Sequence, residues 1–181
     1  MEVEIKYRIS EKSFEDIQIL VEEAGGEFLH ESLERDTYFN VSGRDSMTTK
    51  ECLRIRESHK KGNEITYKPP TEEGKQELHF AKKETNLAVQ DPQAARDLLM
   101  CLGSTILVVV EKNRKYYSLN GCTVCIDKIT DLGIFIEIEV MGNNANAALT
   151  KIKDCAKVLS LDDQDIVTAP YRDLVMQASS V

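Results

Sequence analysis

The sequence predicts an α+β fold in which antiparallel strands carry charged side chains on one face and apolar side chains on the other. The first nine residues alternate strictly, with Glu2, Glu4 and Lys6 on one side and Val3 and Ile5 on the other, because side chains along a strand point to opposite faces in turn. Later segments repeat this spacing. Segments with helical periodicity lie between them and can cover the apolar face.

The strands are predicted from alternation and from β-branched and aromatic residues, and Gly, Pro or polar turns separate them. The segments 27–30 and 35–41 are two strands or one bent strand. Pro69 and Pro70 end the strand before them, because proline cannot donate to a sheet ladder. The full set of predicted strands is 1–9, 27–30, 35–41, 52–57, 64–68, 78–89, 106–117, 121–129 and 134–140.

The helices are predicted from apolar stripes and from capping residues. Ser10 or Ser13 can cap a first helix that ends at Gly25, and Asp91 with Pro92 opens a second helix, since Asp is favoured at the N-cap and Pro at the first helical position. The predicted helices are 10–24, 91–102, 143–159 and a short one at 161–166, and a last short element covers 170–175.

Length and composition fit one globular domain, with 181 residues, 41% hydrophobic and 30% charged. The net charge of −8 argues against a nucleic-acid binder, which needs a basic surface. No stretch approaches the roughly 18 apolar residues of a membrane span, and no signal peptide is visible. Five scattered cysteines, an odd number, favour a reduced, cytoplasmic chain. Cys122 and Cys125, three residues apart in a strand, should face opposite ways.

The charged positions form doublets spaced by two residues, with carboxylates in the first and last strands and cations in the middle ones. They are Glu2, Glu4, Lys6, Arg54, Arg56, Lys68, Lys112, Arg114, Glu137 and Glu139. One interpretation is a solvated sheet face with cross-strand ion pairs. The other is the lining of a closed barrel, where the cations would bind a polyanion such as triphosphate and the carboxylates would hold Mg²⁺ or Mn²⁺.

An ordered set of motifs resembles the CYTH superfamily, the triphosphate tunnel metalloenzymes. The N-terminal Glu2-x-Glu4-x-Lys6 is similar to the family's ExExK signature. Further blocks follow in order: Asp36-Thr37-Tyr38-Phe39, Leu53-Arg54-Ile55-Arg56, Thr66-Tyr67-Lys68-Pro69-Pro70, Glu111-Lys112-Asn113-Arg114, Asp127, and Leu132-Gly133-x-Phe135-x-Glu137-x-Glu139. The resemblance implies an eight-stranded antiparallel closed β-barrel with helices packed outside. It also implies one such domain over residues 1–175, followed by a frayed tail at 176–181.

The resemblance assigns roles by position. It implies Lys6, Arg54, Arg56, Lys68, Lys82, Lys112 and Arg114 as phosphate ligands. It implies Glu2, Glu4, Glu84, Asp127, Glu137 and Glu139 as ligands of Mg²⁺ or Mn²⁺ or of its water. Lys68, with Tyr38, is similar to the group that prepares the attacking water. On the strand before Asp91, Lys82 replaces a usual Arg and Asn86 replaces a usual Glu, while Glu84 is kept.

The chain length, the Asp91-Pro92 helix start and Tyr171-Arg172-Asp173-Leu174 resemble the class IV adenylyl cyclase branch. Two chemistries remain open: cyclisation of ATP to cyclic AMP and pyrophosphate, and hydrolysis of ATP, thiamine triphosphate or inorganic tripolyphosphate. A second alternative is a non-catalytic polyphosphate or nucleotide binder. The expected partner is a triphosphate small molecule rather than a nucleic acid or a membrane. The branch resemblance also allows a homodimer.

Overall fold

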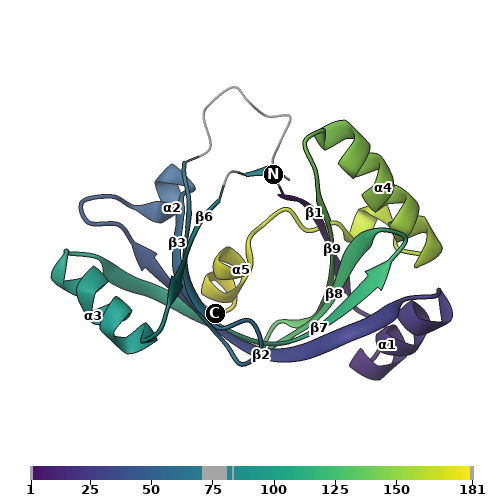
Figure 1. Cartoon of the computed structure of the whole chain (residues 1–181), viewed down its shortest axis with the longest axis horizontal. Helices are drawn as coiled ribbons and strands as arrows, with labels where there is room; N and C mark the ends of the chain where they lie inside the picture. Colours follow the sequence, from purple (N-terminus) through teal and green to yellow (C-terminus); the bar gives the residue numbers. More distant parts are fainter. Residues whose placement is uncertain (1, 71–80, 83, 180–181) are drawn as a thin grey trace.

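The computed structural model describes residues 2–70, 81–82 and 84–179. Within them the chain forms one curved, nine-stranded antiparallel sheet with helices around it (Figure 1). The strand order is β5-β1-β9-β8-β7-β2-β3-β4-β6. The strands are β1 (Glu2–Ile9), β2 (Glu27–Asn40), β3 (Cys52–Ser58), β4 (Asn63–Lys68), β5 (Ala81–Lys82), β6 (Thr85–Val89), β7 (Thr105–Leu119), β8 (Cys122–Ile129) and β9 (Gly133–Met141). The prediction of an α+β fold with an antiparallel sheet is confirmed.

The two segments predicted as 27–30 and 35–41 form one long strand, β2, which pairs with β7 along its whole length. A register shift between Phe28 and His30 bends the strand, because a bulge places two residues opposite one and increases the local twist. The alternative of one bent strand is therefore the one that the chain adopts.

Closure of the barrel is not confirmed, because the sheet of the described residues ends at two edge strands. β5 pairs with β1, while β6 pairs with β4 at the opposite edge. The predicted strand 78–89 is thus divided between the two walls, and residues 78–80 and 83 lie outside the described residues. The sheet curves around a concave face (Figure 1).

The helices are α1 (Phe14–Glu23), α2 (Ser46–Thr49), α3 (Pro92–Cys101), α4 (Ala145–Val158) and α5 (Tyr171–Ala178). Ser13 and Asp91 cap α1 and α3 as predicted. The side chain of each accepts hydrogen bonding from backbone N–H in the first turn of its helix. The helix expected at 161–166 is only a 3₁₀ turn, Asp163–Asp165. α5 continues to Ala178, beyond the predicted end of the ordered domain at 175.

Most helices pack on the convex face of the sheet. α1 and α4 cover the apolar side of β1, β8 and β9, including Val3, Ile5 and Ile138, and α3 covers β2 and β3. α5 is the exception and corrects the expectation that the helices lie outside, because Tyr171 packs with Tyr38 and Phe135 on the concave side (Figure 1). None of the described helices has the length and apolar character needed to span a membrane.

Candidate functional site

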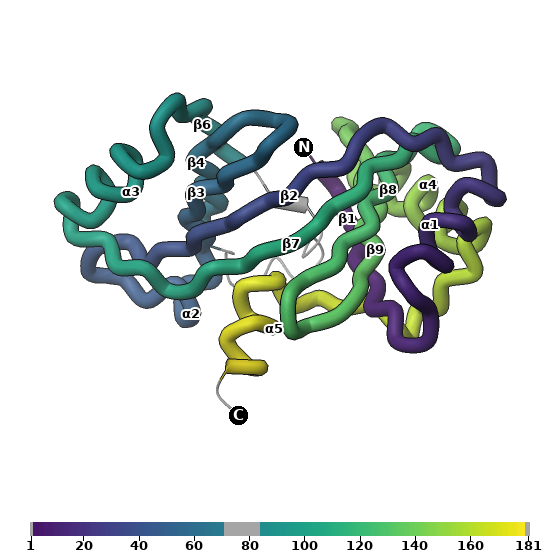
Figure 2. The backbone as a smooth tube through the Cα atoms, turned by 90° about the horizontal axis from the view of Figure 1, so that it is seen from below, coloured from purple at the N-terminus to yellow at the C-terminus, as the bar shows by residue number. Residues whose placement is uncertain are grey.

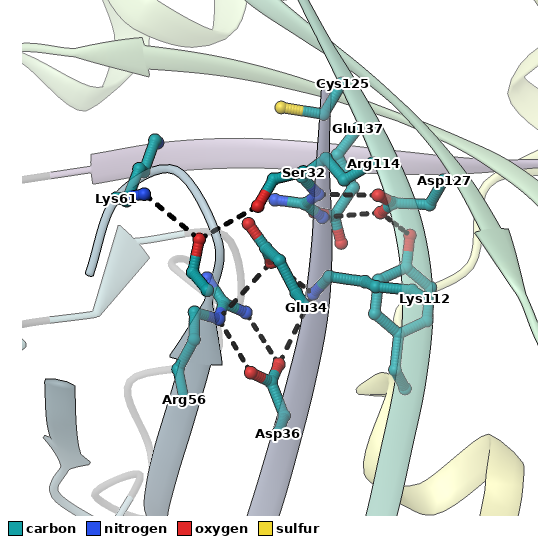
Figure 3. A network of polar contacts seen from close by, with 12 residues as sticks. Ser32, Glu34, Asp36, Arg56, Lys61, Lys112, Arg114, Cys125, Asp127 and Glu137 are labelled. Carbon is teal, nitrogen blue, oxygen red and sulfur yellow. Dashed lines mark hydrogen bonds and ion pairs between the residues drawn. The ribbon is translucent and has the colours of Figure 1, made fainter. Parts of the chain in front are cut away.

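The predicted charged residues converge on the concave face, the side of the sheet opposite α1, α3 and α4. Alternation in each strand explains this, since the apolar partners of these residues pack under the helices. Figure 3 shows side chains from β2, β3, β7, β8 and β9 pointing toward one another. Lys6, Lys112, Arg114, Asp127 and Glu137 are buried despite their charge. Buried charges require partners, and these partners define three groups.

The first group is the acid cluster, Glu2, Glu4 and Glu139. Each can offer one carboxylate oxygen so that all three oxygens lie within 4.8 Å of one another, and the β1–β9 register places Glu4 directly opposite Glu139. The pKa of Glu139 is raised to about 8, mainly because its carboxyl group is buried and also because Glu137, Glu2 and Glu4 repel its charged form. Arg114 opposes this shift. Burial and Glu137 likewise raise the pKa of Glu4. The protein's own cations therefore leave this cluster short of positive charge.

The second group is centred on Arg114. Its guanidinium donates to both oxygens of Asp127 at 2.5 Å each and to Glu137 (Figure 3). Its Nη1 lies 3.5 Å from Glu139. Burial would raise the pKa of Glu137, but the charges of Arg114 and Lys6 outweigh it and lower the pKa to about 2. Two of the predicted metal ligands, Asp127 and Glu137, are thus held by Arg114 outside the acid cluster.

The third group joins β2, β3 and β7. Arg56 donates to both oxygens of Asp36 at 2.7 and 2.6 Å, and Lys112 lies 3.3 Å from both Asp36 and Glu34 (Figure 3). Arg54 lies 3.6 Å from Asp36. Burial opposes ionisation of Asp36, yet Lys112 and Arg56 hold its pKa well below the usual range. Three predicted phosphate ligands are thereby fixed by two acids.

The remaining predicted residues lie around these groups. Lys68 forms an ion pair with Glu84. Burial alone would lower the pKa of Lys68, but the negative charges of Glu4 and Glu84 outweigh this effect and raise the pKa. Tyr38 packs in the apolar cluster under α5, and burial raises its pKa. Lys82 lies in β5 opposite Glu2, and its side chain is outside the described part of the structure.

α5 also reaches the site, which the sequence did not indicate. The hydroxyl of Tyr171 donates to Asp127 at 2.7 Å, and the ring lies 4.1 Å from Lys6 Nζ. Lys6 Nζ in turn donates to the carbonyl oxygen of Ala169 at 2.9 Å. The C-terminal segment therefore fixes one cation and, through Asp127, orients Arg114.

Glu34, Asp36, Cys125 and Tyr171 are site residues that the sequence did not identify. Asp36 lay within a matched motif and on the face of Tyr38, which was the available signal. Cys125 lies on the concave face with its Sγ 3.8 Å from Glu139, while Cys122 packs in the convex core, so the predicted opposite orientation is confirmed.

This arrangement places the acid cluster beside a group of arginine and lysine side chains. Carboxylate oxygens are the ligands that Mg²⁺ and Mn²⁺ prefer, and guanidinium and ammonium groups bind phosphate oxygens. The face can therefore hold a divalent cation and a short polyanion side by side.

Comparisons with known proteins agree with this chemistry. Residues 1–171 match the model of the CYTH domain family. A Methanocaldococcus jannaschii protein named "Putative adenylate cyclase" is 28% identical over 178 residues, covering 96% of this chain and 98% of that protein. A solved Pyrococcus horikoshii OT3 structure is 31% identical with a TM-score of 0.82, covering 96% and 99%. A Hippeastrum structure, described as a "putative adenylyl cyclase" with a dominant triphosphatase activity, has a TM-score of 0.66 and 16% identity over 99% and 96%, which shows the shared fold alone.

Proposed function

The chain belongs to the CYTH family, and from this premise we propose that it is a divalent-metal-dependent enzyme that cleaves a phosphoanhydride bond of a triphosphate bound on the concave face. The main support for this proposal is that the acid cluster lies beside two groups of ion pairs, the second group around Arg114 and the third group around Arg56. A purely structural charged face would balance each carboxylate with a cation. Here Glu4 and Glu139 have raised pKa values instead.

The acid cluster fits Mg²⁺ or Mn²⁺ because it supplies three hard oxygen donors from two adjacent strands. Glu2, Glu4 and Glu139 would hold the ion. When bound, such an ion screens the charge that develops on the phosphate oxygens. Asp127 and Glu137, by contrast, would serve by orienting Arg114, which their hydrogen bonds already hold.

The cations would bind the phosphate chain. Arg54 and Arg56 project from β3, and Lys112 and Arg114 project from β7. These two strands flank β2, so the four side chains can contact phosphate oxygens from several directions. Their carboxylate partners pre-organise them, which favours charge stabilisation without reorganisation. Lys68, with its raised pKa, carries its proton at neutral pH and would orient the attacking group by donating a hydrogen bond.

Two bond cleavages are compatible with this arrangement. Attack of water on the terminal phosphorus releases orthophosphate, whereas attack of a ribose hydroxyl on the α-phosphorus releases pyrophosphate. The name of the Methanocaldococcus relative supports cyclisation, and the described activity of the Hippeastrum protein supports hydrolysis. The protein would supply positioning and charge stabilisation in both cases.

The test is product analysis after incubation with ATP, thiamine triphosphate or tripolyphosphate, with and without Mg²⁺ or Mn²⁺. Cyclic AMP with pyrophosphate would identify a cyclase, and orthophosphate release would identify a triphosphatase. Glu4→Gln should abolish metal-dependent turnover, while the control Glu111→Gln, an exposed residue of β7, should not. Tight triphosphate binding without turnover under either metal would identify a binding protein and reject the enzyme proposal.

A further inference from the structure

Two buried cysteines that are distant in sequence meet where α4 packs on the sheet. Cys122 is the first residue of β8, and Cys155 lies in the last turn of α4. Their side chains are 3% and 1% exposed, and both belong to the core on the convex side of the sheet. Figure 1 and Figure 2 both place α4 beside β8. The candidate site lies on the opposite face, so neither thiol belongs to it.

A hydrogen bond shows how the two thiols lie. The Sγ of Cys122 donates to the carbonyl oxygen of Lys151 at 3.7 Å. Lys151 precedes Cys155 by one helical turn, and a helical side chain tilts back over the turn before it. The thiol of Cys155 therefore points at the place that Cys122 occupies. The two thiols are in fact hydrogen-bonded to each other.

The other cysteines lie elsewhere in the fold. Cys125 is on the concave face beside Glu139, and Cys52 packs against α5. Cys101 is exposed at the end of α3. A disulfide needs Cβ atoms about 4 Å apart, and two thiols in contact approach this geometry with only a small shift of their side chains. The fold therefore brings one particular pair within bonding reach.

We propose that Cys122 and Cys155 form an intramolecular disulfide that fastens α4 to β8, by exchange with a small disulfide such as oxidised glutathione. The thiolate of Cys122 attacks one sulfur of the small disulfide and releases a first thiol. The thiolate of Cys155 then attacks Sγ of Cys122 in the mixed disulfide and releases a second thiol. The two cysteines lose two electrons and two protons, and the small disulfide takes up both and leaves as two thiols.

Burial decides when this exchange occurs. The attacking form is the thiolate, and burial raises the pKa of both cysteines, that of Cys155 to about 12. In the folded chain the thiols are therefore protonated and shielded, and exchange should be slow. Before α4 docks on the sheet both thiols are exposed, so the bond should form as the chain folds. Closing the loop between residues 122 and 155 restricts the unfolded chain and should stabilise the fold.

The first experiment refolds the full chain from guanidinium chloride with a mixture of oxidised and reduced glutathione. Remaining thiols are then blocked under denaturing conditions, and the chain is digested with trypsin. We expect the peptides 116–128 and 154–157 to be linked, lighter by two hydrogens than their summed masses. The first peptide also carries Cys125, so Cys125→Ser is the matched control. It should keep the link, whereas Cys122→Ser should lose it.

The second experiment compares the melting temperatures of the oxidised and reduced forms of each chain. The oxidised wild type should unfold at least about 5 °C above its reduced form. Cys122→Ser and Cys155→Ser should melt at the same temperature with and without reductant. Each variant is compared with itself, so destabilisation by the substitution does not affect the result. A wild-type chain that keeps all its thiols free after refolding, links Cys155 to a different cysteine, or gains no stability from the link would overturn the proposal.

Discussion

Replacing Glu34 by Gln should destabilise the fold at neutral pH and remove part of its sensitivity to acid. Glu34 is 3% exposed and accepts a hydrogen bond from Tyr116 at 2.6 Å. Its other oxygen lies 3.3 Å from Lys112 Nζ and 3.4 Å from Arg56 Nε. Glutamine keeps the shape and loses the charge, so the two cations lose one of their carboxylate partners.

The magnitude follows from the pKa of Glu34. Burial opposes ionisation, but Lys112 and Arg56 outweigh it and lower the pKa from 4.5 to about 2. One pKa unit corresponds to about 1.4 kcal/mol, so ionised Glu34 contributes about 3 kcal/mol of folding free energy. Because the folded-state pKa is the lower one, this contribution is fully present above pH 4.5 and is lost as the pH falls toward about 2.

The assay is urea unfolding of the wild type and Glu34→Gln between neutral pH and about pH 2. The difference in unfolding free energy should be about 3 kcal/mol at neutral pH and should shrink toward zero at the acid end. Glu111→Gln is the control, since Glu111 pairs with Arg35 at the surface and such pairs contribute little. A difference for Glu34→Gln that stays constant over this pH range would refute the assignment of the stability to ionised Glu34.

Three further predictions address the proposed site. Arg56→Ala should raise the dissociation constant for tripolyphosphate by about tenfold or more, as expected for loss of a charged hydrogen-bond donor. Arg35→Ala, a change at an exposed residue, should alter that constant little. Isothermal titration calorimetry measures both constants, and equal effects would contradict the role of Arg56. Glu139→Gln should abolish Mn²⁺ binding, followed by electron paramagnetic resonance, and unchanged binding would show that the acid cluster is not the metal site. Tyr171→Phe removes the hydroxyl that donates a hydrogen bond to Asp127 and keeps the ring over Lys6. We therefore expect weaker tripolyphosphate binding at an unchanged Mn²⁺ affinity. A loss of Mn²⁺ affinity instead would place Asp127 at the metal.

The strands and most helices could be predicted because their signals are local. Alternation in β1 and β9 and the caps at Ser13 and Asp91 depend only on neighbouring residues. The position of α5 could not be predicted, since an amphipathic helix of eight residues does not reveal which apolar surface it covers. Closure of the sheet depends on pairing between distant segments, and the short β5 carries too few residues to show its partner.

For the site, the sequence could predict only which side chains share one face of the sheet and which charges they carry. The spacing of Glu2 and Glu4 placed both on the concave face, and the β1–β9 register brought Glu139 to them. The sequence could not show that Glu137, two residues away, turns to Arg114. Glu34 was missed because it falls between the predicted strands 27–30 and 35–41. Exposed Leu33 and Arg35 flank it, so no buried apolar row marks the opposite face of β2 at that point.

The charge balance of the concave face indicates why metal and substrate should bind together. Among the site residues discussed above, six are cations and eight are acids. The cations are Lys6, Arg54, Arg56, Lys68, Lys112 and Arg114, and the acids are Glu2, Glu4, Glu34, Asp36, Glu84, Asp127, Glu137 and Glu139. A triphosphate entering alone would add negative charge to a face that already carries an excess of it, and Coulomb repulsion from the acid cluster would oppose binding. A divalent cation in that cluster reverses the local sign. We therefore expect each to raise the affinity of the other by the same factor, as thermodynamic linkage requires.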